Sequence, residues 1–377
     1  MQEVNKYDVA IVGGGLAGLC LAIQSAVDGF STILFEKEKY PFHKVCGEYI
    51  SMESYGFLQS LGVDLEAFKV PHINKLTITN IKGKPYHFKL PLGGFGISRY
   101  TLDAALYNIA ILNGVKVVQA KVQDIVYEND AFIIHNNEHA CIATIAAGSF
   151  GKRSNLDIKW KRKFTTKNAE GKNYVAFKYH VKYPHPIDTI ALHNFKDGYC
   201  GISAIEDDKC CVCYLTSADQ LKAAGNSVSR LQNEFLAVNP CLKDIFSSAA
   251  FLYAEPLAIS QISFAAKNIV QDHILLAGDA AGLITPLCGN GMSMAMNASK
   301  ICAATIKDYF LGNLSRKQME TEYVAKWKHN FARRLQVGRT VQNFFGNPGG
   351  TAAFLKVMNA VPLLSKAVIK STHGEPF

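Results

Sequence analysis

The first forty residues contain the pattern that most constrains the fold of this chain. Residues 6–12 (KYDVAIV) form a short apolar run typical of a buried strand, and the glycine-rich stretch 13–18 (GGGLAG) follows it directly. Residues 16–27 favour a helix, and residues 31–36 (STILFE) have the composition of a second strand. A strand, a glycine turn, a helix and a second strand in this order predict one βαβ unit.

Each glycine of this turn has its own physical reason. Gly13 permits the tight turn, Gly15 lets a pyrophosphate approach the backbone because it has no Cβ, and Gly18 allows close packing of helix on strand. The free N–H groups at the start of the helix, beginning with Leu16 and Ala17, attract phosphate charge. The turn is therefore expected to bind the pyrophosphate of a dinucleotide.

An acidic residue ends the second strand at the distance that such a site needs. Glu36 lies 18 residues after Gly18 and can accept hydrogen bonds from both hydroxyls of a ribose. A carboxylate would repel a 2′-phosphate, so the expected ligand is FAD or NAD. We include the neighbouring Lys37 among the expected cofactor-binding residues. The alternative, a glycine turn without a ligand, does not explain the acid.

A second motif in residues 274–296 (ILLAGDAAGLITPLCGNGMSMAM) favours FAD over NAD. Asp279 follows a buried strand and Gly278, at the edge of the sheet where ligands bind, and its carboxylate can accept hydrogen bonds from a ribityl chain. Pro286 rigidifies the next turn, and exposed backbone at a helix start suits the N1–C2=O side of a reduced flavin. The residues expected around that helix start are Gly289, Asn290, Gly291 and Met292.

The two motifs together resemble those of the flavoproteins that include aromatic hydroxylases, flavin-dependent halogenases and geranylgeranyl reductases. The resemblance covers roughly residues 5–305. It implies a hydroxylase-like FAD fold, an antiparallel substrate domain, a pocket between the two at the flavin ring, and Arg99 near the cofactor. Three departures matter: Ala147 stands where hydroxylases carry an acid tied to NADPH handling, Gly282 replaces a histidine as in the reductases, and the tryptophan motif of halogenases is absent.

The segment PFHKVCGEYIS resembles a loop of the reductase branch in which a cysteine faces the flavin. Cys46 occupies that place, although Glu48 stands where the second glycine of the loop is usual. The resemblance implies that the Cys46 thiol passes a proton to a substrate carbon. The alternative, a packed or merely exposed loop cysteine, stays open. Lys44 would lower the pKa of the thiol if the two side chains met.

The remaining strands and helices predict the fold class. We expect an α/β protein in which a Rossmann-type FAD-binding domain, of the hydroxylase-like and glutathione-reductase type, contains an inserted antiparallel β-sheet substrate domain. One helix is expected over residues 217–238 within that insertion. The expected boundaries are 1–71, 98–158 and 267–305 for the FAD-binding domain, 72–97 and 159–266 for the substrate domain, and 306–377 for a helical C-terminal region.

Charge and cysteine content limit the partners and the compartment. Residues 300–377 carry 12 Lys and Arg against 4 Asp and Glu, which is +8 of the total net charge of +9. This basic region predicts contact with a membrane surface or an acidic carrier protein, with a solvated helical face as the alternative. No DNA-binding motif accompanies it, so no nucleic acid is expected. Ten scattered cysteines, no expected metal site, no signal peptide and no membrane-spanning stretch predict a cytoplasmic protein.

These features predict an FAD-dependent oxidoreductase acting on a hydrophobic small molecule. The preferred reaction is NAD(P)H-dependent monooxygenation of a polyketide-like or aromatic compound, because that chemistry is broad in the group. The alternative is a geranylgeranyl-reductase-like enzyme that reduces double bonds of a prenyl lipid, as Cys46 and Gly282 suggest. An alternative of another class is a flavin-binding protein without turnover.

Overall fold

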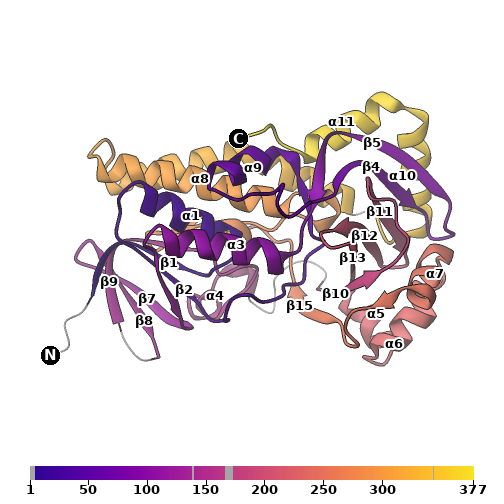
Figure 1. The fold of residues 1–377 in the computed structure, drawn as a ribbon, viewed down its shortest axis with the longest axis horizontal. Helices are drawn as coiled ribbons and strands as arrows, with labels where there is room; N and C mark the ends of the chain where they lie inside the picture. The colour runs from indigo at the N-terminus through magenta and orange to yellow at the C-terminus, as the bar shows by residue number, and fades with distance from the viewer. Residues whose placement is uncertain (1–4, 138–139, 166–172, 343) are drawn as a thin grey trace.

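The computed structural model describes residues 5–137, 140–165, 173–342 and 344–377. Two β-sheets lie at opposite ends of the elongated molecule, and long helices run along one side of it (Figure 1). The sheets, the helices that cover them and the helical C-terminal region confirm the predicted fold class.

The sheet near the N-terminus, sheet A, has the strand order β16-β17-β9-β1-β2-β6. Its central strands pair in parallel, and the stretches of β1 and β2 over residues 9–12 and 33–35 are apolar and buried. An antiparallel pair, β7 and β8, extends the sheet beside β9. The strands of sheet A are β1 (Lys6–Val12), β2 (Thr32–Glu36), β6 (Lys116–Gln119), β7 (Val122–Glu128), β8 (Ala131–Asn136), β9 (Ala140–Gly148), β16 (Val270–Gln271) and β17 (Ile274–Leu276).

The second sheet, sheet B, has the order β14-β10-β13-β12-β11-β4-β5-β3, with β15 beside β10. Its described pairs are antiparallel except for β11 with β4, which is parallel. Residues 49–51, which we expected in the FAD-binding domain, form β3 and pair with β5. The strands of sheet B are β3 (Tyr49–Ser51), β4 (His72–Thr79), β5 (Pro85–Gly96), β10 (Tyr174–Lys182), β11 (Thr189–Phe195), β12 (Gly198–Ile205), β13 (Lys209–Ser217), β14 (Ala250–Phe251) and β15 (Leu257–Ile262).

The helix expected over residues 217–238 is wrong as a single element. It is divided into α5 (Ala218–Ala223), α6 (Val228–Arg230) and a π-helical turn over residues 231–236. Gly225 and Asn226 interrupt it because both have positive φ, and Ser227 caps the next turn. These short helices and α7 (Pro240–Ser248) cover one face of sheet B.

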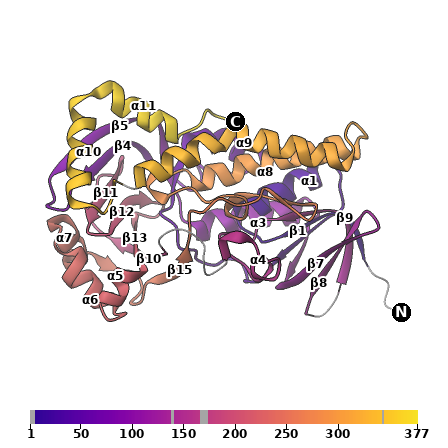
Figure 2. The same ribbon diagram turned by 180° about the vertical axis from the view of Figure 1, so that it is seen from behind.

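Long helices run along one side of the molecule. Helices α1 (Leu16–Val27) and α3 (Arg99–Leu112) contact each other, and α1 also contacts α8 (Gly291–Phe310). Helix α9 (Arg316–Gln342) packs along α8, and α10 (Pro348–Ala360) and α11 (Pro362–Thr372) cover the other face of sheet B (Figure 2). The remaining helices are short: α2 (Tyr55–Ser60) and α4 (Asn155–Lys159).

Candidate functional site

The glycine turn after β1 leaves the start of α1 open to an anion. A Cβ on Gly13 (φ +106°) would lie 2.5 Å from the Ser149 carbonyl oxygen, so this position requires glycine. A Cβ on Gly15 would instead approach only the cationic side chains of Arg99 and Lys44, both at 3.7 Å. Helix α1 has no side-chain cap and no acid in its first turn. Free N–H groups beside two cations therefore fit a pyrophosphate.

Glu36 ends β2 beside this turn. Its carboxylate accepts a hydrogen bond from the Gly14 N–H at 2.8 Å and one from the Glu38 N–H at 3.1 Å. The carboxylate is therefore oriented at the turn, where the ribose of a dinucleotide is expected. The Lys37 side chain lies outside this arrangement, since it is 63% exposed and forms an ion pair with Glu38.

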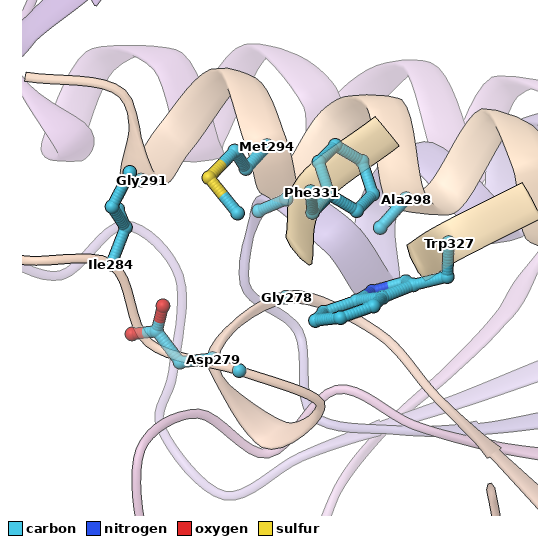
Figure 3. A pocket seen from close by; sticks show the side chains of 10 residues that line it. Gly278, Asp279, Ile284, Gly291, Met294, Ala298, Trp327 and Phe331 are labelled. Atoms are coloured by element: carbon cyan, nitrogen blue, oxygen red, sulfur yellow. The ribbon is translucent and has the colours of Figure 1, made fainter. Parts of the chain in front are cut away.

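Asp279 lies at the carboxyl end of β17, after Gly278 (φ +61°), and lines a small cavity with Met294 and Trp327 (Figure 3). Burial raises the pKa of Asp279, and the nearby Lys267 opposes the rise. Within the described residues, no group donates a hydrogen bond to this carboxylate. A carboxylate with free acceptor capacity at this edge of the sheet fits the hydroxyls of a ribityl chain.

The start of α8 adjoins this cavity. Pro286 begins the preceding turn. Gly289 has positive φ (66°), and a Cβ at this position would collide with the Tyr49 ring. Asn290 precedes the helix without capping it, and the first turn of α8 contains no acid. The Asn290 amide nitrogen donates to the Thr372 carbonyl, while its amide oxygen is buried without a partner in the described structure. The N–H groups of α8 therefore stay available for negative charge on a flavin ring.

Cys46 lies directly at the start of α8. Its Sγ is 3.5 Å from the Sδ of Met292, in the first turn of the helix. Burial raises the pKa of the Cys46 thiol, and Arg99 is the strongest opposing influence. Lys44, whose effect on the thiol depended on the two side chains meeting, instead pairs with the buried carboxylate of Asp103 at 3.0 Å. The thiol is therefore protonated at neutral pH and able to donate a proton.

Glu48, two residues further on, is the site residue whose importance the sequence interpretation missed. Its φ is 55°, so it keeps the left-handed backbone of the usual glycine. Its fully buried carboxylate accepts from the Lys178 ammonium, from His180 Nε2 at 2.6 Å and from the Arg99 N–H at 2.8 Å. Lys178 also donates to the Lys44 carbonyl at 3.1 Å. These contacts with Lys178 and His180 hold the loop that contains Cys46 against β10.

Glu48 and Lys178 form a buried ion pair. Burial alone would raise the pKa of Glu48, but His180 and Lys178 hold it below its ordinary value. Burial would lower the pKa of Lys178, but Glu48 raises it. Both groups are therefore ionised although neither is exposed. The available signal in the sequence was a lysine and a histidine at alternate positions of one apolar strand, YVAFKYHVK.

Arg99 connects the two halves of the site. Its guanidinium donates to both carboxylate oxygens of Asp103, at 2.7 and 2.8 Å, while its side chain lies beside Gly15. Burial raises the pKa of both Asp279 and Cys46, and the positive charge of Arg99 opposes the rise in each, after Lys267 in the case of Asp279. The glycine turn thus lies beside Arg99, the Asp279 loop beside Ala17 of α1, and the α8 start beside Cys46, with Lys37 outside.

Comparison with known proteins agrees with this geometry. Residues 6–165 match a family model described as an FAD binding domain. The chain is 23% identical to Conditioned medium factor receptor 1 of Dictyostelium discoideum, over 91% of this chain and 72% of that protein. It is 21% identical to the digeranylgeranylglycerophospholipid reductase of Methanococcus aeolicus, over 89% and 86%.

A solved structure shows the same fold over nearly the whole chain. It is a geranylgeranyl bacteriochlorophyll reductase-like protein of Thermoplasma acidophilum, with a TM-score of 0.74 and 20% identity. The match covers 99% of this chain and 93% of that one. With the matched FAD domain and the related reductases, the chain is an FAD-dependent oxidoreductase that is similar to the aromatic hydroxylase and geranylgeranyl reductase flavoproteins.

Proposed function

We propose that this protein reduces carbon–carbon double bonds in a prenyl lipid, with Cys46 as the proton donor beside the flavin. The observation that carries the proposal is the Cys46 Sγ, 3.5 Å from Met292 at the start of α8. A reductase needs an acid at this place, whereas an oxygen-transferring flavoenzyme does not. The similarity to a digeranylgeranylglycerophospholipid reductase supports the same choice of reaction.

The residues present fit FAD. The start of α1 would hold the pyrophosphate, Glu36 the ribose of the adenosine, Asp279 the ribityl chain, and the start of α8 the flavin ring. When bound, FAD supplies the hydride for such a reduction. The protein contributes the binding groups, the orientation of the substrate and a proton at the Cys46 Sγ.

The surroundings of Cys46 suit a long apolar substrate. Sheet B turns an apolar face toward the 43–48 loop and α10, and its side chains form one packed cluster, which we call the apolar cluster. Val45, next to Cys46, and Leu283 and Leu287, before α8, pack against this cluster. The apolar cluster includes Ile78, Tyr86, Ala176, Leu192, Tyr199, Leu215, Ile262, Phe345 and Leu355. A hydrocarbon chain on this face would lie beside the thiol.

The reaction can be tested with a lipid that carries a geranylgeranyl chain. Chemically reduced protein, incubated with this lipid without oxygen, should give products heavier by two hydrogens per double bond in mass spectrometry. The electron donor is proposed to be NAD(P)H, and oxidation of NADH or NADPH during turnover measures it. Hydroxylated products formed only with oxygen would favour monooxygenation of an aromatic or polyketide-like compound instead.

We expect the purified protein to be yellow and to release FAD, not FMN, on heat denaturation. The adenosine half of the ligand is needed to engage Glu36 and the start of α1, which FMN does not reach. Chromatography of the released flavin against both standards measures this. A colourless protein that takes up NAD but no flavin would contradict the cofactor assignment.

Replacement of Glu36 or of Asp279 by alanine should each weaken FAD binding at least tenfold. Each change removes one or two charge-assisted hydrogen bonds, worth about 1.5–3 kcal/mol apiece. Titration of apoprotein with FAD, followed by flavin fluorescence, gives the dissociation constants. Glu38→Ala is the matched control, because the Glu38 side chain is 51% exposed and should leave the affinity unchanged. Wild-type affinity in both site variants would show that these carboxylates do not contact FAD.

A further inference from the structure

Helices α10 and α11 form a bent pair whose outer side is apolar and exposed. They meet near Val361 at an angle of 111°. Leu363 is 80% exposed, Val357 50%, Val361 44% and Leu364 40%. We call residues 356–370 the elbow. A group of large apolar side chains left in water at one corner of a protein is a marker of an interaction site.

The opposite side of each helix is packed, so the exposed side chains are a second, separate face. Leu355 of α10 is completely buried in the apolar cluster, and Met358 is 3% exposed. Ile369 of α11 packs with Tyr49 and Leu90 of sheet B. The fold thus already uses the inner faces of both helices, and within the described structure no element covers the outer face.

The sequence around the elbow is positively charged. Residues 323–374 contain eight Lys and Arg and no Asp or Glu. Lys356, Lys366 and Lys370 lie on the elbow itself, and all three are exposed. The nearest acid along the chain, Glu375, is 3.9 Å from Lys370, and both side chains are 83% exposed. Such an open pair contributes little and leaves the elbow basic.

We propose that the elbow docks the protein on the surface of an anionic lipid bilayer. A bilayer offers an apolar layer and a negative layer next to each other, which match the apolar corner and its flanking lysines. No single described helix is long and apolar enough to cross a membrane; the bent pair meets that test only when its two helices are joined. Helices of 13 and 11 residues at this angle suit the interface, since a span needs about 20 residues.

Docking would place the bilayer on the outer side of α10, whose inner side packs on the apolar cluster. Leu355, on the inner side of α10, belongs to the same apolar cluster against which Val45 packs beside Cys46. A lipid chain that leaves the bilayer for the thiol would have to pass α10 to reach this cluster. This consequence rests on the proposed function, whereas docking itself does not and is tested with protein that carries out no reaction.

The test is flotation of the FAD-loaded protein with two kinds of vesicle. Vesicles of phosphatidylcholine with phosphatidylserine should carry the protein, and pure phosphatidylcholine vesicles should carry at least tenfold less. Leu363→Glu combined with Leu364→Glu should lower binding at least tenfold. Lys366→Glu should lower it about fivefold, because each basic residue near an anionic surface contributes roughly that factor. Raised salt should weaken binding in parallel.

Leu112→Glu is the matched control, because Leu112 is 85% exposed at the end of α3, away from the elbow. It should bind vesicles like the wild type, with flavin content and unfolding temperature confirming that all variants fold. Failure of the wild type to float with anionic vesicles, or equal binding by the Leu363→Glu/Leu364→Glu variant, would overturn the proposal. Capture by an immobilised acidic carrier protein, with no vesicle binding, would do so as well. Loss of double-bond reduction with normal flotation would overturn the proposed function alone.

Discussion

Replacement of Cys46 by alanine should lower turnover of a prenyl lipid by about 10²–10⁴-fold, because the reaction loses its general acid. Burial keeps the Cys46 thiol protonated, and its Sγ lies at the start of α8 where the flavin ring is expected. Cys46→Ser should recover little, since a hydroxyl is a far weaker acid than a thiol. Single-turnover measurements that separate flavin reduction from product formation provide the readout, and only product formation should slow.

Cys213→Ala is the control for this experiment. Cys213 is also partly buried and lies on β13, opposite Lys178 of β10, so its loss tests for a general effect of removing a thiol near the site. The Cys213→Ala variant should turn over within about tenfold of the wild-type rate, because altered packing alone can change the rate by that much. A Cys46→Ala protein with full FAD content and near-normal turnover would contradict the proposed reductase mechanism and favour oxygen transfer.

The second large effect is expected at Glu48. Glu48→Gln should lower the free energy of unfolding by about 3–5 kcal/mol, because Lys178 then carries a buried charge without its counter-ion. Urea unfolding, followed by tryptophan fluorescence, measures the change. Adding Lys178→Met to Glu48→Gln should recover most of the loss, since the double variant buries no unpaired charge.

The matched control is Glu322→Gln on α9, which removes an exposed pair with Lys326 and should cost about 0.3–0.5 kcal/mol. Equal effects of Glu48→Gln and Glu322→Gln would mean that the buried cluster contributes no more than a surface ion pair. A double variant less stable than Glu48→Gln would show that Lys178 has another partner strong enough to hold its charge.

Local patterns predicted the parts of the site that depend on neighbours in the chain. The strand, turn and helix around Gly13 and Gly18 follow from steric rules that act within a few residues. The helix expected to begin at Gly291 also begins there in the structure. Here a glycine, an acid and an apolar run lie close together in the sequence, so their geometry follows from the backbone.

The cluster around Glu48 could not be predicted in the same way. Its contacts with Lys178 and His180 join residues 130 and 132 positions apart, and depend on the register of β10 within sheet B. The partner of Lys44 could not be predicted for the same reason, since Asp103 lies on another element, α3. Burial of charge is decided by the assembled fold, and a loop sequence alone contains no information on which distant cation will neutralise it.

The contact between Asn290 and Thr372 links the turn before α8 to the C-terminal end of the chain. Residues 6–36 form a βαβ unit from neighbouring parts of the chain. The turn before α8 waits for a segment 82 residues further on, because the Thr372 carbonyl accepts the Asn290 amide hydrogen bond. Phe377 then packs on Phe57, with ring centroids 5.3 Å apart. The half of the site expected to hold the flavin therefore depends on the C-terminal segment, whereas the turn expected to hold the pyrophosphate lies in the first βαβ unit.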